Sequence, residues 1–125
     1  MIVGVCSARL PDMKIEEYGF GRIVIDGKEY AEDVIITPGG VKPNWWRQEG
    51  HDVKLFDLAD VLDPKPRLII IGTGASGMCR VSDEVRSYCN SQEVELVELP
   101  TPEAVVEYNE LDDKAGVLVA LHLTC

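Results

Sequence analysis

The pattern of apolar and polar residues is most regular from Leu68 to the end of the chain. Residues 68–71 are apolar at every position, which is typical of a strand covered on both faces of a sheet. Residues 94–99 alternate and predict a second strand, and the nearly all-apolar residues 116–123 predict a third. Two segments with helical periodicity separate these three strands.

The first of these helices is predicted to begin after Ser82, a good N-cap, and to run to about Asn90. The second is predicted at Thr101-Pro102-Glu103, with Thr101 as cap and Pro102 in the first helical position. Each helix has an apolar face. The first presents Val81, Val85, Tyr88 and Cys89, and the second presents Ala104, Val105, Tyr108 and Leu111.

The first half of the chain is less regular. Residues 22–31 predict a hairpin around Asp26-Gly27, because this pair supplies the positive φ angles of a type I′ turn. Residues 34–37 predict another strand, and residues 41–51 form a loop that contains both tryptophans. A short helix is expected over residues 57–62, with Asp57 as its N-cap. Residues 1–17 show weak periodicity and are expected to be irregular, before a single domain over residues 18–125.

Together these elements predict an α/β fold with a mixed central sheet. An N-terminal antiparallel hairpin is followed by a β-α-β-α-β half, whose parallel crossovers should be right-handed.

Composition narrows the class of protein. The chain has 125 residues and a net charge of −10, which disfavours nucleic acid or an anionic membrane as a partner. No apolar run is long enough to span a bilayer, and the N-terminus does not resemble a secretory signal. We therefore expect a cytoplasmic protein, whose four cysteines (Cys6, Cys79, Cys89 and Cys125) are free thiols.

No catalytic or metal-binding set stands out. His122 and Cys125 give only two ligands, so we expect no metal and no cofactor. Ser76 lacks the spacing of a nucleophile elbow. Cys79 would be a nucleophile only if Arg80 or a helix N-terminus lowered its pKa, and neither histidine lies in its segment.

Gly72, Gly74 and Gly77 match the G-x-G-x-x-G spacing of a dinucleotide-binding loop. In such a loop the helix begins among the glycines, whereas here the predicted cap is Ser82. Two interpretations remain: the glycines form a tight connection, or the strand end binds a small molecule or anion. The candidates for the second are Gly72, Thr73, Gly74, Ser76, Gly77 and Arg80.

Trp45, Trp46 and Arg47 form the other candidate site. Neighbouring residues of an extended segment point to opposite sides, so one tryptophan should anchor the loop and the other should be exposed. Trp and Arg are enriched at the energetic centres of protein interfaces. The alternative is that both tryptophans anchor the loop. His51, at the end of the loop, is expected to be a hydrogen-bonded structural residue.

Several stretches taken together resemble the MTH-type domain family, whose biochemical function is unknown. They are the hairpin from Gly21 to Tyr30, the Pro38–His51 segment, IIIGTG at 69–74, the Thr101–Asn109 segment, and the terminal HLTC. The resemblance implies a three-layer α/β domain and no established active site. Its relatives include a mammalian adipogenesis-associated protein and an assembly factor of mitochondrial complex I, so it also implies partner binding. We expect a bacterial or archaeal homologue.

Two functions are consistent with these observations. The first is a non-catalytic interaction or assembly module that docks a protein partner through Trp45, Trp46 and Arg47. The alternative is a small-molecule or anion-binding protein, or an enzyme that acts on such a ligand, that uses residues 72–77 with Arg80. Self-pairing of an edge strand into a homodimer stays open.

Overall fold

The computed structural model describes residues 13–124. Its centre is a five-stranded sheet in the order β5-β4-β10-β7-β9. β4 (Val34–Thr37) and β5 (Gly40–Lys42) form an antiparallel pair, and β10 (Val117–His122) pairs antiparallel with β4. β7 (Leu68–Thr73) is parallel to both β10 and β9 (Glu95–Leu99). The sheet is therefore mixed, as the sequence predicted.

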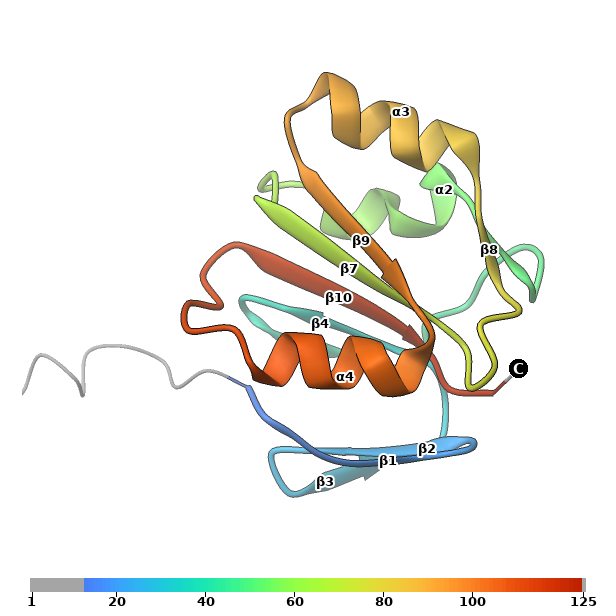
Figure 1. Cartoon of the computed structure of the whole chain (residues 1–125), viewed down its shortest axis with the longest axis vertical. Coiled ribbons are helices and arrows are strands. Elements are labelled where there is room, and N and C mark those ends of the chain that lie inside the picture. Colours follow the sequence, from blue (N-terminus) through green and yellow to red (C-terminus); the bar gives the residue numbers. More distant parts are fainter. Residues whose placement is uncertain (1–12, 125) are drawn as a thin grey trace, which may run out of the picture.

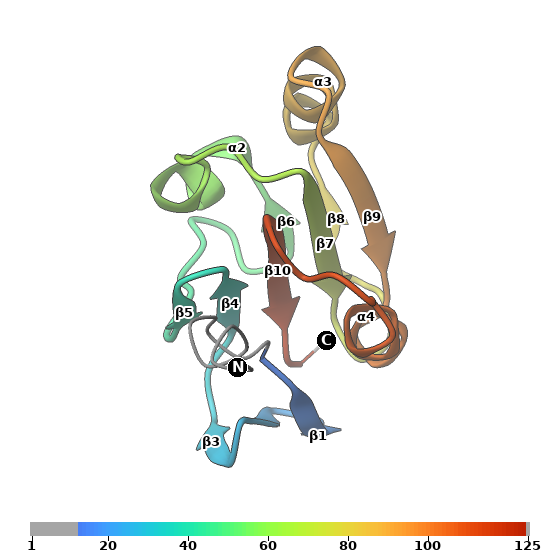
Figure 2. The same cartoon turned by 90° about the vertical axis from the view of Figure 1, so that its left-hand side faces the viewer.

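The five-stranded sheet is the middle of three layers (Figures 1 and 2). One face is covered by α2 (Leu55–Leu58), a 3₁₀ turn (Ala59–Val61) and α3 (Asp83–Ser91). The other face is covered by α4 (Thr101–Asn109) and by an antiparallel sheet of β1 (Ile15–Gly19), β2 (Arg22–Ile25) and β3 (Lys28–Tyr30). All residues of β7 and β10 are buried, because both faces of these central strands are covered.

The hairpin is formed as predicted. Asp26 and Gly27 both have positive φ, 50° and 83°, and they join β2 to β3. The expectation of an irregular segment over residues 1–17 is wrong at its end, because residues 15–17 belong to β1. This strand was missed because only Ile15 among its five residues is fully buried. Residues 1–12, with Cys6, and Cys125 lie outside the described residues.

Two predicted helix starts are wrong. α2 begins at Leu55 and not after Asp57; the Asp57 carboxylate accepts the Lys54 N–H from inside the first turn. Thr101 is the first residue of α4 and not its cap. Its hydroxyl is buried and donates to the His122 carbonyl at 2.6 Å while accepting the Gly74 N–H at 2.9 Å. This side chain therefore joins α4 to the ends of β7 and β10.

Three further short strands were missed. β5 includes residues 41 and 42, which the sequence assigned to the start of the loop. β6 (Asp52–Val53) and β8 (Arg80–Val81) form a parallel ribbon beside the carboxyl end of β7. Val81 consequently lies in β8 and not on the face of the following helix. Two residues are too few for a recognisable alternation, and the pairing depends on segments far apart in the sequence.

Candidate functional site

Residues 72–77, which we call the glycine loop, are separated from α3 by β8. α3 begins at Asp83 with Ser82 as its N-cap, as the sequence predicted. Its N-terminus therefore lies outside the Gly72–Gly77 segment. The geometry of a dinucleotide-binding loop, in which helical amides cradle the pyrophosphate from within the glycines, is not present.

Gly72 allows β7 to pack closely against Leu121 and Thr101. A Cβ at Gly72 would lie 2.8 Å from Leu121 Cδ2 and 2.9 Å from Thr101 Oγ1. At Gly77, where φ is 73°, a Cβ would lie 3.3 Å from Pro100 Cγ. These glycines let the loop pass close to the start of α4.

Most backbone N–H groups of this segment have partners inside the protein. Gly74 donates to Thr101 Oγ1, Ala75 to the Thr124 carbonyl and Gly77 to the Gly74 carbonyl. Thr73 Oγ1 in turn donates to the Leu99 carbonyl at 3.1 Å. Ligand recognition at this strand end would therefore depend on side chains more than on a cradle of loop amides.

A cavity of about 620 Å³ opens beside the loop, between β8, the start of α3 and the end of β9. We call it the strand-end cavity. It brings together four of the six predicted binding residues: Thr73, Ser76, Gly77 and Arg80. Gly72 and Gly74 are not part of its wall. Sequence reasoning missed the remaining wall residues, which come from separate segments: Asp52, Lys54, Cys79, Val81, Ser82, Asp83, Arg86, Glu98, Leu99 and Pro100.

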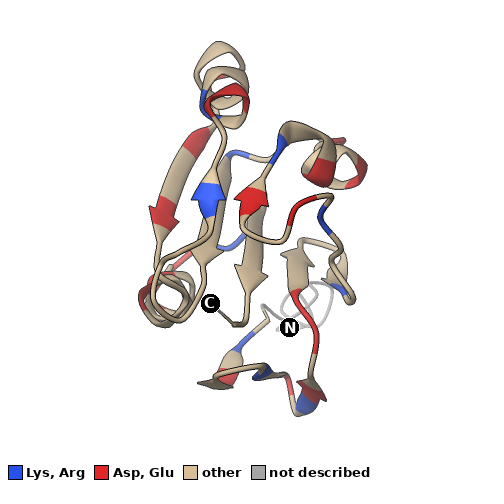
Figure 3. Cartoon of the chain, turned by 90° about the vertical axis from the view of Figure 1, so that its right-hand side faces the viewer, with Lys and Arg blue, Asp and Glu red and all other residues tan. Residues whose placement is uncertain are grey.

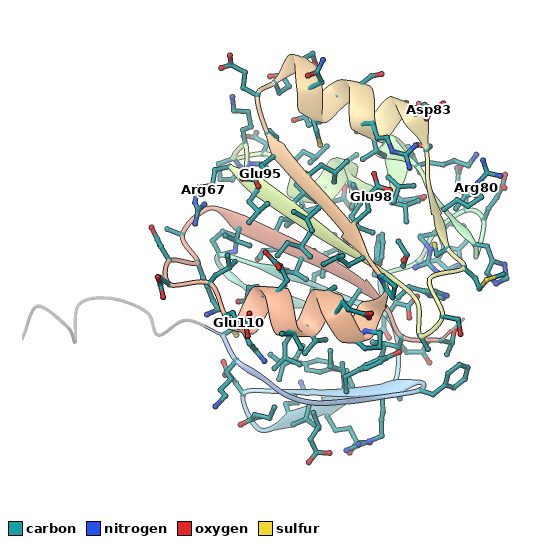
Figure 4. All side chains as sticks on the ribbon, in the orientation of Figure 1. Arg67, Arg80, Asp83, Glu95, Glu98 and Glu110 are labelled. Carbon is teal, nitrogen blue, oxygen red and sulfur yellow. The ribbon has the colours of Figure 1, made fainter. Side chains whose placement is uncertain are left out.

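Acidic and basic residues both line the cavity. Figure 3 marks the positions of residues of each charge along the ribbon. Two of the cavity's carboxylates are bound to Arg86, which lies 2.8 Å from both oxygens of Glu98 and 2.9 Å from Asp83. These hydrogen bonds, led by those to Glu98, raise the pKa of Arg86. In Figure 4, Asp83 lies at the start of α3, Glu98 on β9 and Arg80 on β8.

Two polar groups of the wall lack such partners. Arg80 is exposed and has no acidic side chain at ion-pair distance among residues 13–124. The Ser82 hydroxyl is buried and makes no hydrogen bond within the same range. These two groups are therefore available to a ligand.

The thiol of Cys79 is not an activated nucleophile. Cys79 is buried, and burial raises the pKa of its thiol more than the nearby Arg47 lowers it. The condition that would have made Cys79 reactive, a lowered pKa, is therefore not met.

Trp45, Trp46 and Arg47 lie in the loop before β6, which we call the tryptophan loop. Two of these three candidate residues are buried and one is exposed. Trp45 is 6% exposed, and its indole N–H donates to the Asp57 carbonyl at 3.0 Å. Trp46 is 74% exposed. The prediction that one tryptophan anchors the loop while the other faces outward is thus confirmed. Arg47 is buried, with its guanidinium 4.7 Å from the Trp45 ring centroid.

Arg47 belongs to a buried polar network with Asp33 and His122. Arg47 Nη1 lies 2.8 Å from Asp33 Oδ2 and His122 Nδ1 lies 2.7 Å from the same oxygen. The backbone N–H of Leu123 donates to Asp33 Oδ1 at 2.8 Å, and Arg47 Nη2 donates to the Gly50 carbonyl. The network ties the tryptophan loop to β10 and to the residue just before β4.

Burial alone would raise the pKa of Asp33. The hydrogen bonds from His122, the Leu123 amide and Arg47 outweigh this effect and lower the pKa of Asp33 below its usual value. An ionised carboxylate only accepts hydrogen bonds, so the contact with Asp33 requires a proton on His122 Nδ1. The same nitrogen lies 2.9 Å from Arg47 Nη2, which is also a donor, so these two groups are in contact without a hydrogen bond in this tautomer. Its ring also meets the ring of His51 edge-on, at 6.3 Å between centroids. No sequence motif identified this network, because its three residues lie far apart in the chain.

The part of the chain that the structure describes contains no group of three or more histidine, cysteine or acidic residues placed to hold an ion. None of its helices is long and apolar enough to cross a membrane.

The three layers and the strand-end cavity define a mixed α/β protein. A family model described as a protein of unknown function (DUF498/DUF598) matches residues 15–122, and the chain belongs to this family. A conserved hypothetical protein from Pyrococcus horikoshii, PH1505, is 31% identical over 90% of this chain and 99% of its own, with a TM-score of 0.76.

Two further solved structures have the same fold. A protein called MT938 is 27% identical over 91% of this chain and 100% of its own, with a TM-score of 0.72. A Bordetella pertussis protein described as a Mth938-like domain is 20% identical over 91% of this chain and 89% of its own, with a TM-score of 0.65. The resemblance to the MTH-type family is thereby confirmed.

Proposed function

We propose that the protein binds a small anionic molecule in the strand-end cavity. The observation that supports this most is the cavity itself, about 620 Å³ at the carboxyl end of β7. Open α/β sheets commonly bind ligands at this position, and a volume of this size accommodates a metabolite. Arg80 and Ser82 supply a cation and a hydroxyl whose hydrogen-bonding capacity is unused within the described chain.

The wall favours an anion of low charge. Arg86 is already bound to Glu98 and Asp83, and Lys54 lies 3.5 Å from Glu49. Arg80 is therefore the cation left for a ligand, while Asp52 in the same wall adds a negative charge. A single carboxylate or phosphate group matches this balance better than a polyphosphate would.

The experiment is thermal-shift screening of the full chain with inorganic phosphate, nucleoside monophosphates and small carboxylates. Calorimetric titration of each hit would follow. Arg80→Ala should weaken binding by tenfold or more, which corresponds to about 1.4 kcal/mol. Lys28→Ala, which removes a cation from β3, should leave the affinity unchanged. A screen without hits, or equal affinity for the Arg80→Ala variant, would refute the proposal.

Protein docking is a second candidate function, favoured by a different observation. Trp46 and Phe56 are 74% and 68% exposed, and both line one hollow of about 300 Å³. Exposed aromatic side chains that flank a pocket are typical anchors of protein interfaces. Trp45 and Arg47 face inward, so in this function they hold the loop in place while Trp46 contacts the partner.

The test of docking compares two exposed aromatic residues. Trp46→Ala should remove partner capture from an extract of the native cell. Phe20→Ala should not, since Phe20 is equally exposed but lies between β1 and β2. Equal capture by both variants would contradict docking through the tryptophan loop.

A further inference from the structure

The hollow beside Trp46 and Phe56 continues along one edge of the central sheet. A second hollow of about 590 Å³ shares three residues with it: Lys42, Asp60 and Val61. The second hollow is lined largely by the 37–42 turn and the proline-rich segment 63–66. We call the two together the edge groove.

The strand that borders the edge groove has room for another strand. Within residues 13–124, β5 is hydrogen-bonded on one side only, to β4. Backbone N–H and C=O groups on the open side of an edge strand can pair with an extended segment of another chain. A segment added there would run past both hollows, and its side chains on one face would meet them.

The charge of the groove indicates which segment fits. The chain carries a net charge of −10. In the groove, Lys42 is paired with Asp60 at 3.2 Å, and Asp57, Asp63 and Lys65 also line its walls, so acidic residues outnumber basic ones by three to two. The exposed Trp46 ring offers a face on which a guanidinium or ammonium group can stack. Positive charge on the partner would also speed its association.

From these observations we propose that the edge groove binds an extended, basic segment of a partner protein. The segment pairs with β5, places apolar side chains in the two hollows and stacks an arginine or lysine on Trp46. This inference rests on the docking function and is independent of ligand binding in the strand-end cavity.

The probe is a fluorescein-labelled peptide of about ten residues that alternates valine and arginine, followed by anisotropy with the full chain. Three peptides serve as comparisons: one with glutamate in place of arginine, one with lysine, and one with proline in place of alternate valines. Proline cannot donate to a strand, so the proline peptide reports on pairing with β5.

The arginine peptide should bind, and Trp46→Ala should weaken it by tenfold or more. Phe20→Ala and Arg80→Ala should change its affinity less than twofold, so a failure here is distinguishable from a failure of cavity binding. The glutamate and proline peptides should bind at least tenfold more weakly than the arginine peptide. The lysine peptide should bind within a few-fold of it.

Three results would overturn the proposal. The first is equal binding of the arginine peptide by the wild-type protein and the Trp46→Ala variant, which would indicate unspecific attraction to an acidic protein. The second is equal binding of the glutamate or proline peptide. The third is a dimer, measured by light scattering, that Trp46→Ala converts to a monomer, since the occupant of the groove would then be a second copy of this chain.

Discussion

At the scale of single residues, Asp33 is a carboxylate held in a largely buried hydrogen-bond network. Its carboxylate receives hydrogen bonds from His122, Arg47 and the Leu123 amide, and its side chain is only 16% exposed. Removing one partner of a buried ion pair is costly, because the remaining charge stays buried without compensation.

Asp33→Asn should therefore lower the free energy of unfolding by about 2–4 kcal/mol at pH 7, measured by urea denaturation. The pKa of Asp33 is lowered in the folded protein, so its charged form stabilises the fold above the unfolded-state pKa of about 3.9. As the pH falls from that value through the lower pKa of the folded protein, the stabilisation is progressively lost. The difference between wild type and variant should accordingly shrink at about pH 3.

Asp60→Asn is the matched control for this prediction. Asp60 also pairs with a cation, Lys42, but its side chain is 84% exposed. Exposed ion pairs contribute about 0–1 kcal/mol, so this variant should remain close to wild type at both pH values. If both aspartate variants lost the same stability, the buried network would have no special role.

At the scale of elements, the tryptophan loop is held by its buried residues and leaves Trp46 free. Trp45→Ala removes a buried ring, its hydrogen bond to the Asp57 carbonyl and its contact with Arg47. We expect it to lower the free energy of unfolding by about 3–5 kcal/mol. Trp46→Ala should change it by less than about 0.5 kcal/mol, because the ring is exposed. Urea denaturation of both variants measures these two changes in the free energy of unfolding.

Equal destabilisation by the two substitutions would show that both tryptophans anchor the loop. The contrast also matters for the binding experiments, since Trp46→Ala is informative there only if the variant folds as the wild type does.

The same elements show how much of the structure can be read from the sequence. The Asp26-Gly27 turn, the strand from Leu68 and the start of α3 after Ser82 were all predicted, because each depends on local chemistry. A turn needs positive φ, and a strand covered on both faces needs a run of apolar residues. Ser82 does occupy the N-cap position of α3, although its hydroxyl makes no capping hydrogen bond.

The elements that were missed depend on distant contacts. β8 is a strand because it pairs with β6 and because the Arg80 N–H donates to the His51 carbonyl. Thr101 resembles a cap, yet its hydroxyl is used by the ends of two other strands. For the same reason only four residues of the strand-end cavity were predicted: Thr73, Ser76, Gly77 and Arg80. Most of its other wall residues come from β6, β8, α3 and β9.

At the scale of the whole molecule, the two faces of the central sheet have separate hydrophobic clusters. One joins the sheet to α4 and the three-stranded sheet, and the other joins it to α2 and α3. β7 and β10 contribute to both clusters and are hydrogen-bonded on both sides. Exchange of their amides with solvent therefore requires the central sheet to open, which disrupts buried contacts of both clusters.

The β6–β8 ribbon, by contrast, has two residues in each strand and no further strand beside it in the described chain. Local opening is easiest where few buried contacts hold an element, and binding sites are often built from such segments. We therefore expect hydrogen exchange, measured by NMR, to be slowest for Ile69–Ile71 and Val119–Leu121. The Arg80 and Ser82 amides, which bond to the His51 and Val53 carbonyls, should exchange at least tenfold faster.

A ligand in the strand-end cavity would change this order of exchange rates, because Arg80 and Ser82 form part of the cavity wall. Binding stabilises only the closed form of the ribbon, so exchange of these two amides should slow as ligand is added. The amides of β3, which lie on the opposite layer, should be slowed only to the extent that they exchange by global unfolding. If ligand slowed β3 and the β6–β8 ribbon equally, the ribbon would not open independently and the binding site would be part of the rigid core.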